Sequence, residues 1–174
     1  MPKEKIIAYL IGESISSNLK LAIDLASKSN LGEFKKNKVI YSFSESLYLV
    51  EEKRMEVFYG NKKLDFNSLL KKLKRIDKDI ILKYSVFKDL RDKGYIVKTA
   101  LKFGSEFRVY EKGVKPGKGH AKWIVYPISQ NSKLDLKDFS AKSRIANSTK
   151  KLLLLGIVDS DGDVSYYEVK WLKA

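Results

Sequence analysis

The chain contains no cysteine, and this absence excludes several kinds of chemistry at once. Disulfide bonds, thiolate catalysis and cysteine-based metal sites all need a thiol. Long apolar runs are also absent, since no stretch approaches the ~18 apolar residues of a membrane-spanning helix. The apolar run after Lys5 is too short for the core of a secretory signal. We therefore expect a soluble, cytoplasmic protein.

Acidic residues are too few to balance the basic ones. Of 174 residues, 35 are Lys or Arg and 21 are Asp or Glu, so the formal net charge is +14. Residues 108–122 hold a single acid, Glu111, among these basic side chains: Arg108, Lys112, Lys115, Lys118 and Lys122. A heat-stable, lysine-rich surface is the alternative explanation, but in such surfaces acids rise together with lysines. The excess therefore favours a nucleic-acid partner.

Histidine occurs once, at position 120, at the end of the segment Val-Lys-Pro-Gly-Lys-Gly-His. This composition predicts an exposed, positively charged loop. A histidine side chain ordinarily titrates near ~6.5, so it can transfer a proton near neutral pH, for example beside a phosphate. The alternative is a surface histidine without a role.

Apolar periodicity predicts a mixture of helices and strands. Helices are expected over 18–28, 44–50, 65–74, 78–93 and 136–148, and strands over 5–11, 55–59, 95–98, 106–111, 122–126, 151–158 and 164–172. Ser42 or Ser44 and Asp65 are the candidate N-caps, and Gly94 should end its helix. Residues 31–38 read as a polar loop, and Pro127 should mark a strand end or edge. Residues 151–158 predict a buried central strand, followed by a hairpin turn at 159–163.

These elements predict an α/β (α+β) protein with two parts. The first, residues 1–82, is expected to be a small mixed α/β domain. The second, residues 83–174, is expected to be a domain with a mixed central sheet flanked by helices. The boundary falls near 79–85 and runs directly into a helix.

Several blocks of the chain occur in one order: KYSVFKDLRDKGYIVK at 83–98, KFGSEFRVYEKG at 102–113, His120, RIANSTKK at 144–151 and DSDGD at 159–163. Together they resemble the catalytic domain of the archaeal tRNA-splicing endonucleases. The segment SFSESLYL at 42–49 is the clearest shared piece of the first half. A set of blocks in one order is far harder to obtain by chance than a single motif.

The resemblance implies a nuclease-like fold and a metal-independent cleavage of RNA that needs no cofactor. Tyr110 would be the general base that takes the proton of the attacking 2′-hydroxyl, and His120 the general acid that protonates the leaving 5′-oxygen. Lys151 would stabilise charge on the phosphate, with Lys150 as its rival for that role. The products would be a 2′,3′-cyclic phosphate and a 5′-hydroxyl. A tyrosine ordinarily titrates near ~10, and adjacent cations would favour its phenolate form.

The family pattern also implies residues that hold the substrate, a precursor tRNA with a bulge–helix–bulge element. Arg144 matches one of the flat groups that clamp a splayed base, and Trp171 lies near the position of the other. Core packing is the alternative role for Trp171. Lys35 and Lys36, with Lys38, resemble a lysine-bearing insertion that aids substrate binding in some archaeal members; a solvated loop is the alternative.

The resemblance also implies that the acidic turn at 159–163 docks into a basic pocket of another subunit. A plain hairpin turn is the alternative, and a calcium loop is excluded because the glycine and the distal glutamate are misplaced. Two cut sites require two active subunits, so we expect a heterotetramer with a structural subunit, or else a homotetramer. A non-catalytic RNA-binding or structural subunit is the competing function, and a metal-dependent nuclease would need clustered acids that the sequence does not offer.

Overall fold

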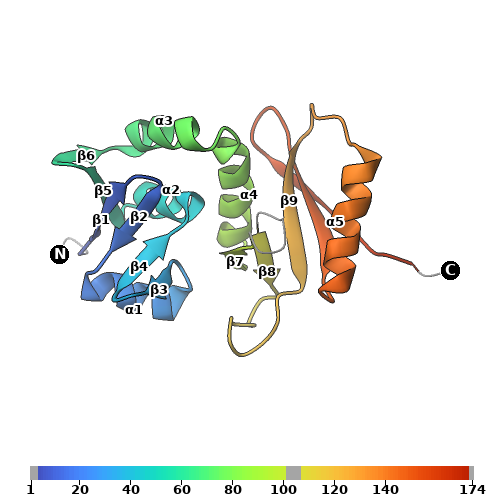
Figure 1. Cartoon of the computed structure of the whole chain (residues 1–174), viewed down its shortest axis with the longest axis horizontal. Coiled ribbons are helices and arrows are strands. Elements are labelled where there is room, and N and C mark those ends of the chain that lie inside the picture. The colour runs from blue at the N-terminus through green and yellow to red at the C-terminus, as the bar shows by residue number, and fades with distance from the viewer. Residues whose placement is uncertain (1–3, 101–106, 173–174) are drawn as a thin grey trace. The chain divides into compact units, whose positions relative to one another are not determined.

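The structure, a computed structural model, describes residues 4–100 and 107–172. The chain divides into two compact units, Met1–Tyr84 and Ser85–Ala174, each with its own sheet (Figure 1). The mixture of helices with two mixed sheets confirms the predicted α+β class. No helix within the described ranges is long and apolar enough to span a membrane.

The first unit is built on a six-stranded sheet of order β3-β4-β2-β1-β5-β6. Its strands are β1 (Ile6–Ile11), β2 (Ser14–Ser17), β3 (Glu33–Lys35), β4 (Lys38–Tyr41), β5 (Met55–Tyr59) and β6 (Lys62–Leu64). β1 pairs in parallel with β5 and antiparallel with β2. Ile6, Ala8 and Leu10 alternate along β1 as buried residues, so one face of this sheet meets the core.

Three helices belong to this unit, α1 (Lys20–Ser29), α2 (Phe43–Glu51) and α3 (Phe66–Ile76), and the last two begin at side-chain caps. Ser42 caps α2 in a reciprocal capping box with Glu45, and Asp65 caps α3 by accepting a 2.7 Å hydrogen bond from the Ser68 amide. That backbone hydrogen bond lowers the pKa of Asp65. The predicted caps Ser42 and Asp65 are therefore confirmed.

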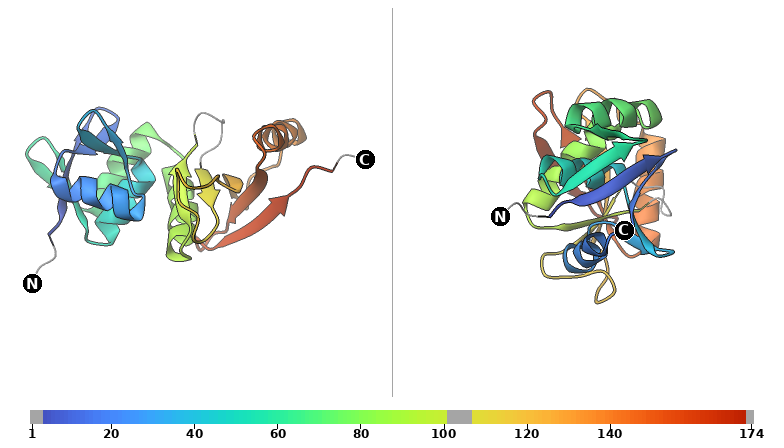
Figure 2. Two further views of the ribbon diagram at one scale, coloured as in Figure 1. Left: turned by 90° about the horizontal axis from the view of Figure 1, so that it is seen from below. Right: turned by 90° about the vertical axis from the view of Figure 1, so that its left-hand side faces the viewer.

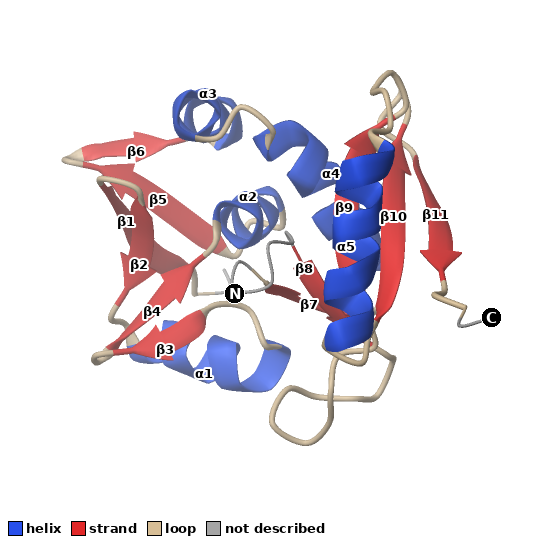
Figure 3. Ribbon diagram, turned by 45° about the vertical axis from the view of Figure 1, so that its right-hand side comes forward, coloured by secondary structure: helices blue, strands red, loops and turns tan. Residues whose placement is uncertain are grey.

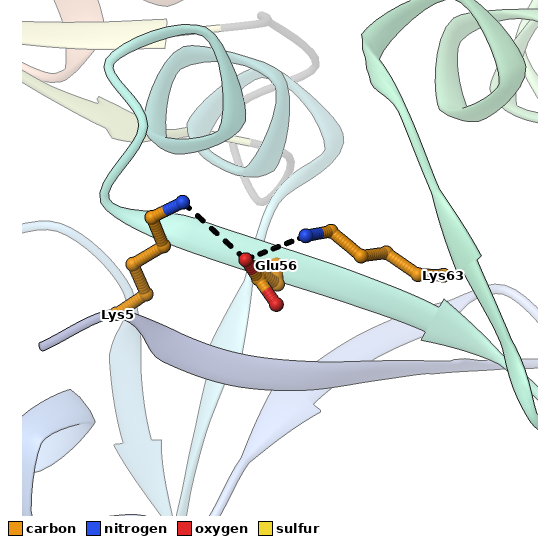
Figure 4. Close-up of polar contacts among 3 residues, drawn as sticks. All are labelled: Lys5, Glu56 and Lys63. Atoms are coloured by element: carbon orange, nitrogen blue, oxygen red, sulfur yellow. Dashed lines mark hydrogen bonds and ion pairs between the residues drawn. The ribbon is translucent and has the colours of Figure 1, made fainter.

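An ion-pair cluster links three segments on the other face of the same sheet (Figure 4). Glu56 of β5 pairs with Lys63 of β6 at 2.6 Å and with Lys5, just before β1, at 3.3 Å. The hydrogen bond from Lys63 is the main cause that lowers the pKa of Glu56. The two lysines are about half exposed, so the cluster stabilises the sheet only modestly.

The expected polar loop over 31–38 is wrong, because the chain forms a β-hairpin there. β3 and β4 pair antiparallel, with Lys35 opposite Lys38. Lys36 and Asn37 make the turn, and both have a positive φ, 47° and 64°. Two consecutive residues with positive φ form the turn whose twist suits a two-residue hairpin, and asparagine tolerates that backbone well. β2 and β6 are further short strands that the sequence pattern did not predict.

The second unit is a five-stranded sheet of order β11-β10-β9-β8-β7. Its strands are β7 (Ile96–Thr99), β8 (Phe107–Tyr110), β9 (Trp123–Ser129), β10 (Leu152–Val158) and β11 (Val164–Val169). β9 and β10 are parallel, and the other neighbouring pairs are antiparallel. β10 lies between two partners, as expected for a buried central strand. The predicted strand residue 106 lies outside the described residues.

Two helices cover the two faces of this sheet, α4 (Ile80–Asp92) and α5 (Leu136–Ser148) (Figures 2 and 3). Leu153 and Leu155 of β10 pack in one core cluster with Ala146 of α5. Gly156 points to the opposite face, where a Cβ would meet Val86 of α4 at 3.1 Å. Successive side chains of β10 therefore point alternately to the face covered by α5 and to the face covered by α4.

The ends of these elements agree with most sequence predictions. α5 covers the predicted 136–148, and Gly94 (φ 88°) follows α4, with the Tyr95 amide bonded to the Leu90 carbonyl, as in a glycine C-cap. β9 continues through Pro127, which pairs with Gly156 of β10, whereas β8 pairs with β9 only as far as Val125. Pro127 therefore lies beyond the residues of β9 that pair with β8. This position agrees with the prediction that Pro127 marks a strand end or edge.

Candidate active site

Three neighbouring strands of the second sheet bring Tyr110, His120 and Lys151 to one end of it. Tyr110 is the last residue of β8, and Lys151 directly precedes β10. Lys122, two residues after His120, ties both strands together: its amide donates to the Val109 carbonyl and its carbonyl accepts from the Leu152 amide, each at 2.9 Å. We call this end, where β8 finishes and β9 and β10 begin, the site end of the sheet.

Register also determines which face carries these side chains. Val109, Trp123 and Leu152 lie side by side in one row across β8, β9 and β10. Tyr110 and Lys151 each lie one residue further towards the site end. Side chains alternate along a strand, and Leu153 belongs to the α5 face; Lys151 and Tyr110 therefore share that face. Neighbouring strands lie ~4.8 Å apart, so the two backbones are separated by about 10 Å. Side chains of that length can meet at one phosphate.

Tyr110 is held firmly at this position. It is 5% exposed, and its backbone pairs with Ile96 of β7. A buried tyrosine ring at a strand end has little rotational freedom, which suits a group that must meet a substrate in one orientation.

His120 is exposed and lies at the end of a loop that hydrogen-bonds to itself. The Val114 amide donates to the Glu111 carbonyl at 3.0 Å, and the Gly119 amide donates to the Lys115 carbonyl at 3.1 Å. Gly119 also approaches Val114 so closely that a Cβ would lie 2.5 Å from its Cγ1. Ala121, the next residue, is buried. The imidazole is therefore reachable from solvent while its backbone is anchored on both sides.

Lys151 lies directly after the C-terminal end of α5. Its amide donates to the Ala146 carbonyl at 2.9 Å, and the Lys150 amide donates to the Asn147 carbonyl at 3.0 Å. This pair of bonds forms a Schellman motif, which stops the helix and turns the chain into β10. The Lys151 ammonium donates to the Thr149 carbonyl at 2.9 Å, at the negative end of the helix dipole.

Arg144 and Trp171 line one cavity of about 260 Å³, together with Phe139, Ser140, Ser143, Val169 and Lys170. Trp171 follows β11, which is antiparallel to β10, and Val169 pairs with Leu153 near the site end. Trp171 is 62% exposed, so the alternative of core packing for this residue is wrong. The two candidate base-clamping residues are thus brought together beside α5.

Lys35 and Lys36 belong to the first unit, at the tip of the β3–β4 hairpin. Both are exposed, and Lys35 pairs with Glu33 at 3.0 Å. They thus belong to a different unit of the chain from Tyr110, His120 and Lys151.

The acidic turn lies at the far end of the same sheet. It joins β10 to β11, and the Asp159 carboxylate accepts hydrogen bonds from the Asp161 and Asp163 amides at 2.9 and 3.0 Å. β10 has seven residues, so about 20 Å separates the turn from the site end. Asp159 shapes the turn, whereas Asp161 and Asp163 are exposed.

The sequence predicted several residues beside the site end as parts of strands or as charged residues, but it did not predict their contacts. Lys122 forms an ion pair with Glu111, and this hydrogen bond raises the pKa of Lys122. The Trp123 indole donates to Glu168 at 2.7 Å, which lowers the pKa of that carboxyl. Neither pair has a sequence signal, because the partners are 11 and 45 residues apart. Residues 4–100 and 107–172 contain no group of three or more His, Cys, Asp or Glu side chains that could hold a metal ion.

Comparison with known proteins decides the family. Residues 80–166 match the family model of the tRNA intron endonuclease catalytic C-terminal domain. A tRNA-splicing endonuclease of Pyrococcus horikoshii is 42% identical over 98% of this chain and 99% of the relative. Proteins of the same name from Nanoarchaeum equitans (44%, 74% of this chain, 86% of the relative) and Methanothermobacter thermautotrophicus (35%, 88% and 89%) are also similar. This chain belongs to the tRNA intron endonuclease family.

The predicted resemblance is therefore confirmed, and the chain is an endonuclease of this family. The matched region of the tRNA intron endonuclease domain contains Tyr110, His120, Lys151 and Arg144. The whole-length similarity extends to the first unit as well, where the sequence blocks were weaker.

Proposed function

We propose that the chain cuts introns out of precursor tRNA at bulge–helix–bulge elements. Tyr110 removes the proton of the 2′-hydroxyl next to the cut site, and that oxygen forms a bond to the adjacent phosphorus. The bond from phosphorus to the 5′-oxygen breaks, and His120 gives that oxygen its proton. Lys151 stabilises the additional negative charge on the phosphate. The products are a 2′,3′-cyclic phosphate and a 5′-hydroxyl.

The observation that carries this proposal is that the three residues lie at the same end of one sheet. A buried phenol, an exposed imidazole and an ammonium come from β8, from the loop before β9 and from the residue before β10. Internal attack by a 2′-hydroxyl needs a base, an acid and a cation on the phosphate, and it needs no activated water. We therefore propose that the cleavage requires no metal ion.

Substrate recognition in this proposal uses a splayed base rather than a sequence. Arg144 and Trp171 line one cavity of about 260 Å³, and a flat guanidinium and an indole can both stack on a base. Lys35 and Lys36 at the hairpin tip would add phosphate contacts. Recognition of splayed bases and phosphates is the usual mode for structured RNA.

The two cut sites of such a substrate require two active subunits at a fixed distance. We propose that the 159–163 turn docks into a basic pocket of another subunit, because its position at the far end of β10 leaves the site end accessible. A heterotetramer with a structural subunit is the favoured assembly, and a homotetramer is the alternative. The mass of the purified chain alone distinguishes them.

A cleavage assay with the purified chain, alone and together with a related structural subunit, tests this function against the role of a non-catalytic subunit. An intron-containing precursor tRNA should be cut at both exon–intron junctions. The new 3′ ends should carry cyclic phosphates, which block labelling of those ends until the phosphate ring is opened. An RNA that is bound but left intact, with or without a related subunit, would favour the non-catalytic role.

A further inference from the structure

We propose that Glu111, Lys122 and the ring pair Tyr95–Trp123 form a clamp that closes the His120 loop and positions His120 as the general acid. The inference rests on the proposed function, because it assigns these residues to the geometry of that reaction. None of them is a catalytic residue; they act through the backbone of the loop, residues 111–122.

The ion pair closes the loop at its base. The chain leaves the sheet after Tyr110 and returns at Trp123, so Glu111 and Lys122 are the first and last residues between the two strands. Their side chains form an ion pair. Because Glu111 directly follows Tyr110, the same contact ties the candidate base to the segment that carries the candidate acid.

The aromatic pair anchors both ends of the loop a second time. The rings of Tyr95 and Trp123 meet edge to face, with centroids 5.9 Å apart and an interplanar angle of 85°. The Lys112 ammonium lies 5.1 Å from the centroid of Tyr95, and the Lys122 ammonium lies 4.7 Å from that of Trp123. One lysine from each end of the loop therefore packs on one member of a single aromatic pair.

The ring of Trp123 is itself fixed by polar contacts. Its indole nitrogen donates to Glu168 of β11 at 2.7 Å, so the ring is tied across β10 to the edge strand. Lys170 lies 3.4 Å from the other carboxylate oxygen of Glu168. The hydrogen bond to Glu111 is the main cause that raises the pKa of Lys122, and the negative charge of Glu168 adds to it, so both favour the charged lysine that the clamp needs.

The loop is stiff between its two ends, so a shift at either end should move His120. Its two internal turns and the close approach of Gly119 to Val114 restrict the backbone before His120. A displacement of about 1 Å at a proton donor can cost ~10²-fold in rate. Opening the base of the loop should therefore affect the step that needs the acid and leave the other steps unchanged.

The cleavage test compares two RNA linkages under single-turnover conditions. With Glu111→Gln, the native 5′-oxygen linkage should be cut at least ~10-fold more slowly, and a 5′-phosphorothiolate, whose sulfur leaves without a proton, should be cut at nearly the wild-type rate. Asp138→Asn is the matched control, because it also removes one negative charge from an exposed ion pair, here with Lys142 on α5. An equal loss on both linkages would overturn the positioning role.

A double-mutant cycle separates the clamp from a direct contact between Lys122 and RNA. If the two residues act as a pair, Glu111→Gln combined with Lys122→Met should lose no more than the worse single variant. Additive losses, together with weaker RNA binding for Lys122→Met, would assign Lys122 to the substrate and contradict the clamp.

A measurement that does not depend on cleavage keeps the clamp testable if the proposed function fails. Because the chain has one histidine, labelling with ¹⁵N-histidine gives a single backbone amide signal from His120. Its relaxation should show greater mobility in Glu111→Gln and in Lys122→Met, and no change in Asp138→Asn. Unchanged mobility in the two clamp variants would refute the clamp, whatever the RNA assay gives.

Discussion

Lys150 and Lys151 are adjacent in the chain but have different structural positions. Lys150 is exposed and has a left-handed backbone, with a φ of 56°, at the residue after the C-cap of α5. Lys151 is half-buried, and it continues the row of Tyr110 on the α5 face of the sheet. The backbone therefore places the two lysines differently, since Lys150 lies in the turn that ends the helix and Lys151 lies at the site end of the sheet.

Lys150→Gly should leave the enzyme active and make it slightly more stable. A side chain in a left-handed conformation costs about 1 kcal/mol, which glycine avoids, although glycine also gains freedom in the unfolded chain. We expect a stability gain of at most about 1 kcal/mol in urea unfolding. Single-turnover cleavage should stay within about threefold of wild type.

Lys151→Ala should instead lower the single-turnover rate by ~10²–10³-fold, the range expected for loss of one group aimed at developing charge. The Schellman bonds use backbone atoms of residue 151, so the fold should survive. Filter binding to the RNA and circular dichroism check that binding and folding are retained. A large rate loss in Lys150→Gly with little loss in Lys151→Ala would reverse the assignment.

Cleavage should continue in an excess of EDTA. The three proposed groups supply the base, the acid and the phosphate cation, so a divalent ion has no required step. The assay needs enough monovalent salt to keep the RNA folded, with the fold checked by native gel. Complete loss of cleavage, restored by Mg²⁺ while the RNA fold is intact, would contradict the proposed mechanism.

The helix caps and the central strands could be predicted from the sequence because each has a local signature. Ser42 and Asp65 precede apolar periodic segments, and Gly94 follows one. β3 had no such signature, because all three of its residues are exposed and the turn residues Lys36 and Asn37 include no glycine. A polar hairpin and a polar loop look the same in a single sequence.

The sequence predicted which residues form the candidate site, but it did not predict how they are arranged in space. Strand order places β8, β9 and β10 side by side, and no local pattern reveals that order. The resemblance named Tyr110, His120 and Lys151. The Glu111–Lys122 contact depends on how the loop folds back, so it became visible only in the structure.

Removing the two exposed charges of the acidic turn should weaken assembly. In Asp161→Asn combined with Asp163→Asn, the hairpin should persist, because the Asp159 carboxylate accepts both turn amides. Sedimentation should show dissociation at lower salt than for wild type, with activity falling in parallel, because salt screens the same contacts.

Glu13→Gln combined with Glu52→Gln is the control for the loss of two charges, because both are exposed acidic residues of the first unit. If the double variant keeps the wild-type oligomeric state and salt response, the turn is only a hairpin turn. Apolar contacts would then have to explain the assembly.

Rescue by the leaving group tests the assigned roles of His120 and Tyr110 most directly. Proton donation acts in the transition state, so His120→Ala should lower the single-turnover rate on the native linkage by ~10²-fold or more, with RNA binding little changed. The 5′-phosphorothiolate linkage should restore the rate of His120→Ala towards wild type. It should leave Tyr110→Phe slow, because removal of the 2′-hydroxyl proton is still required. Equal rescue of both variants, or of neither, would contradict the assignment of Tyr110 as base and His120 as acid.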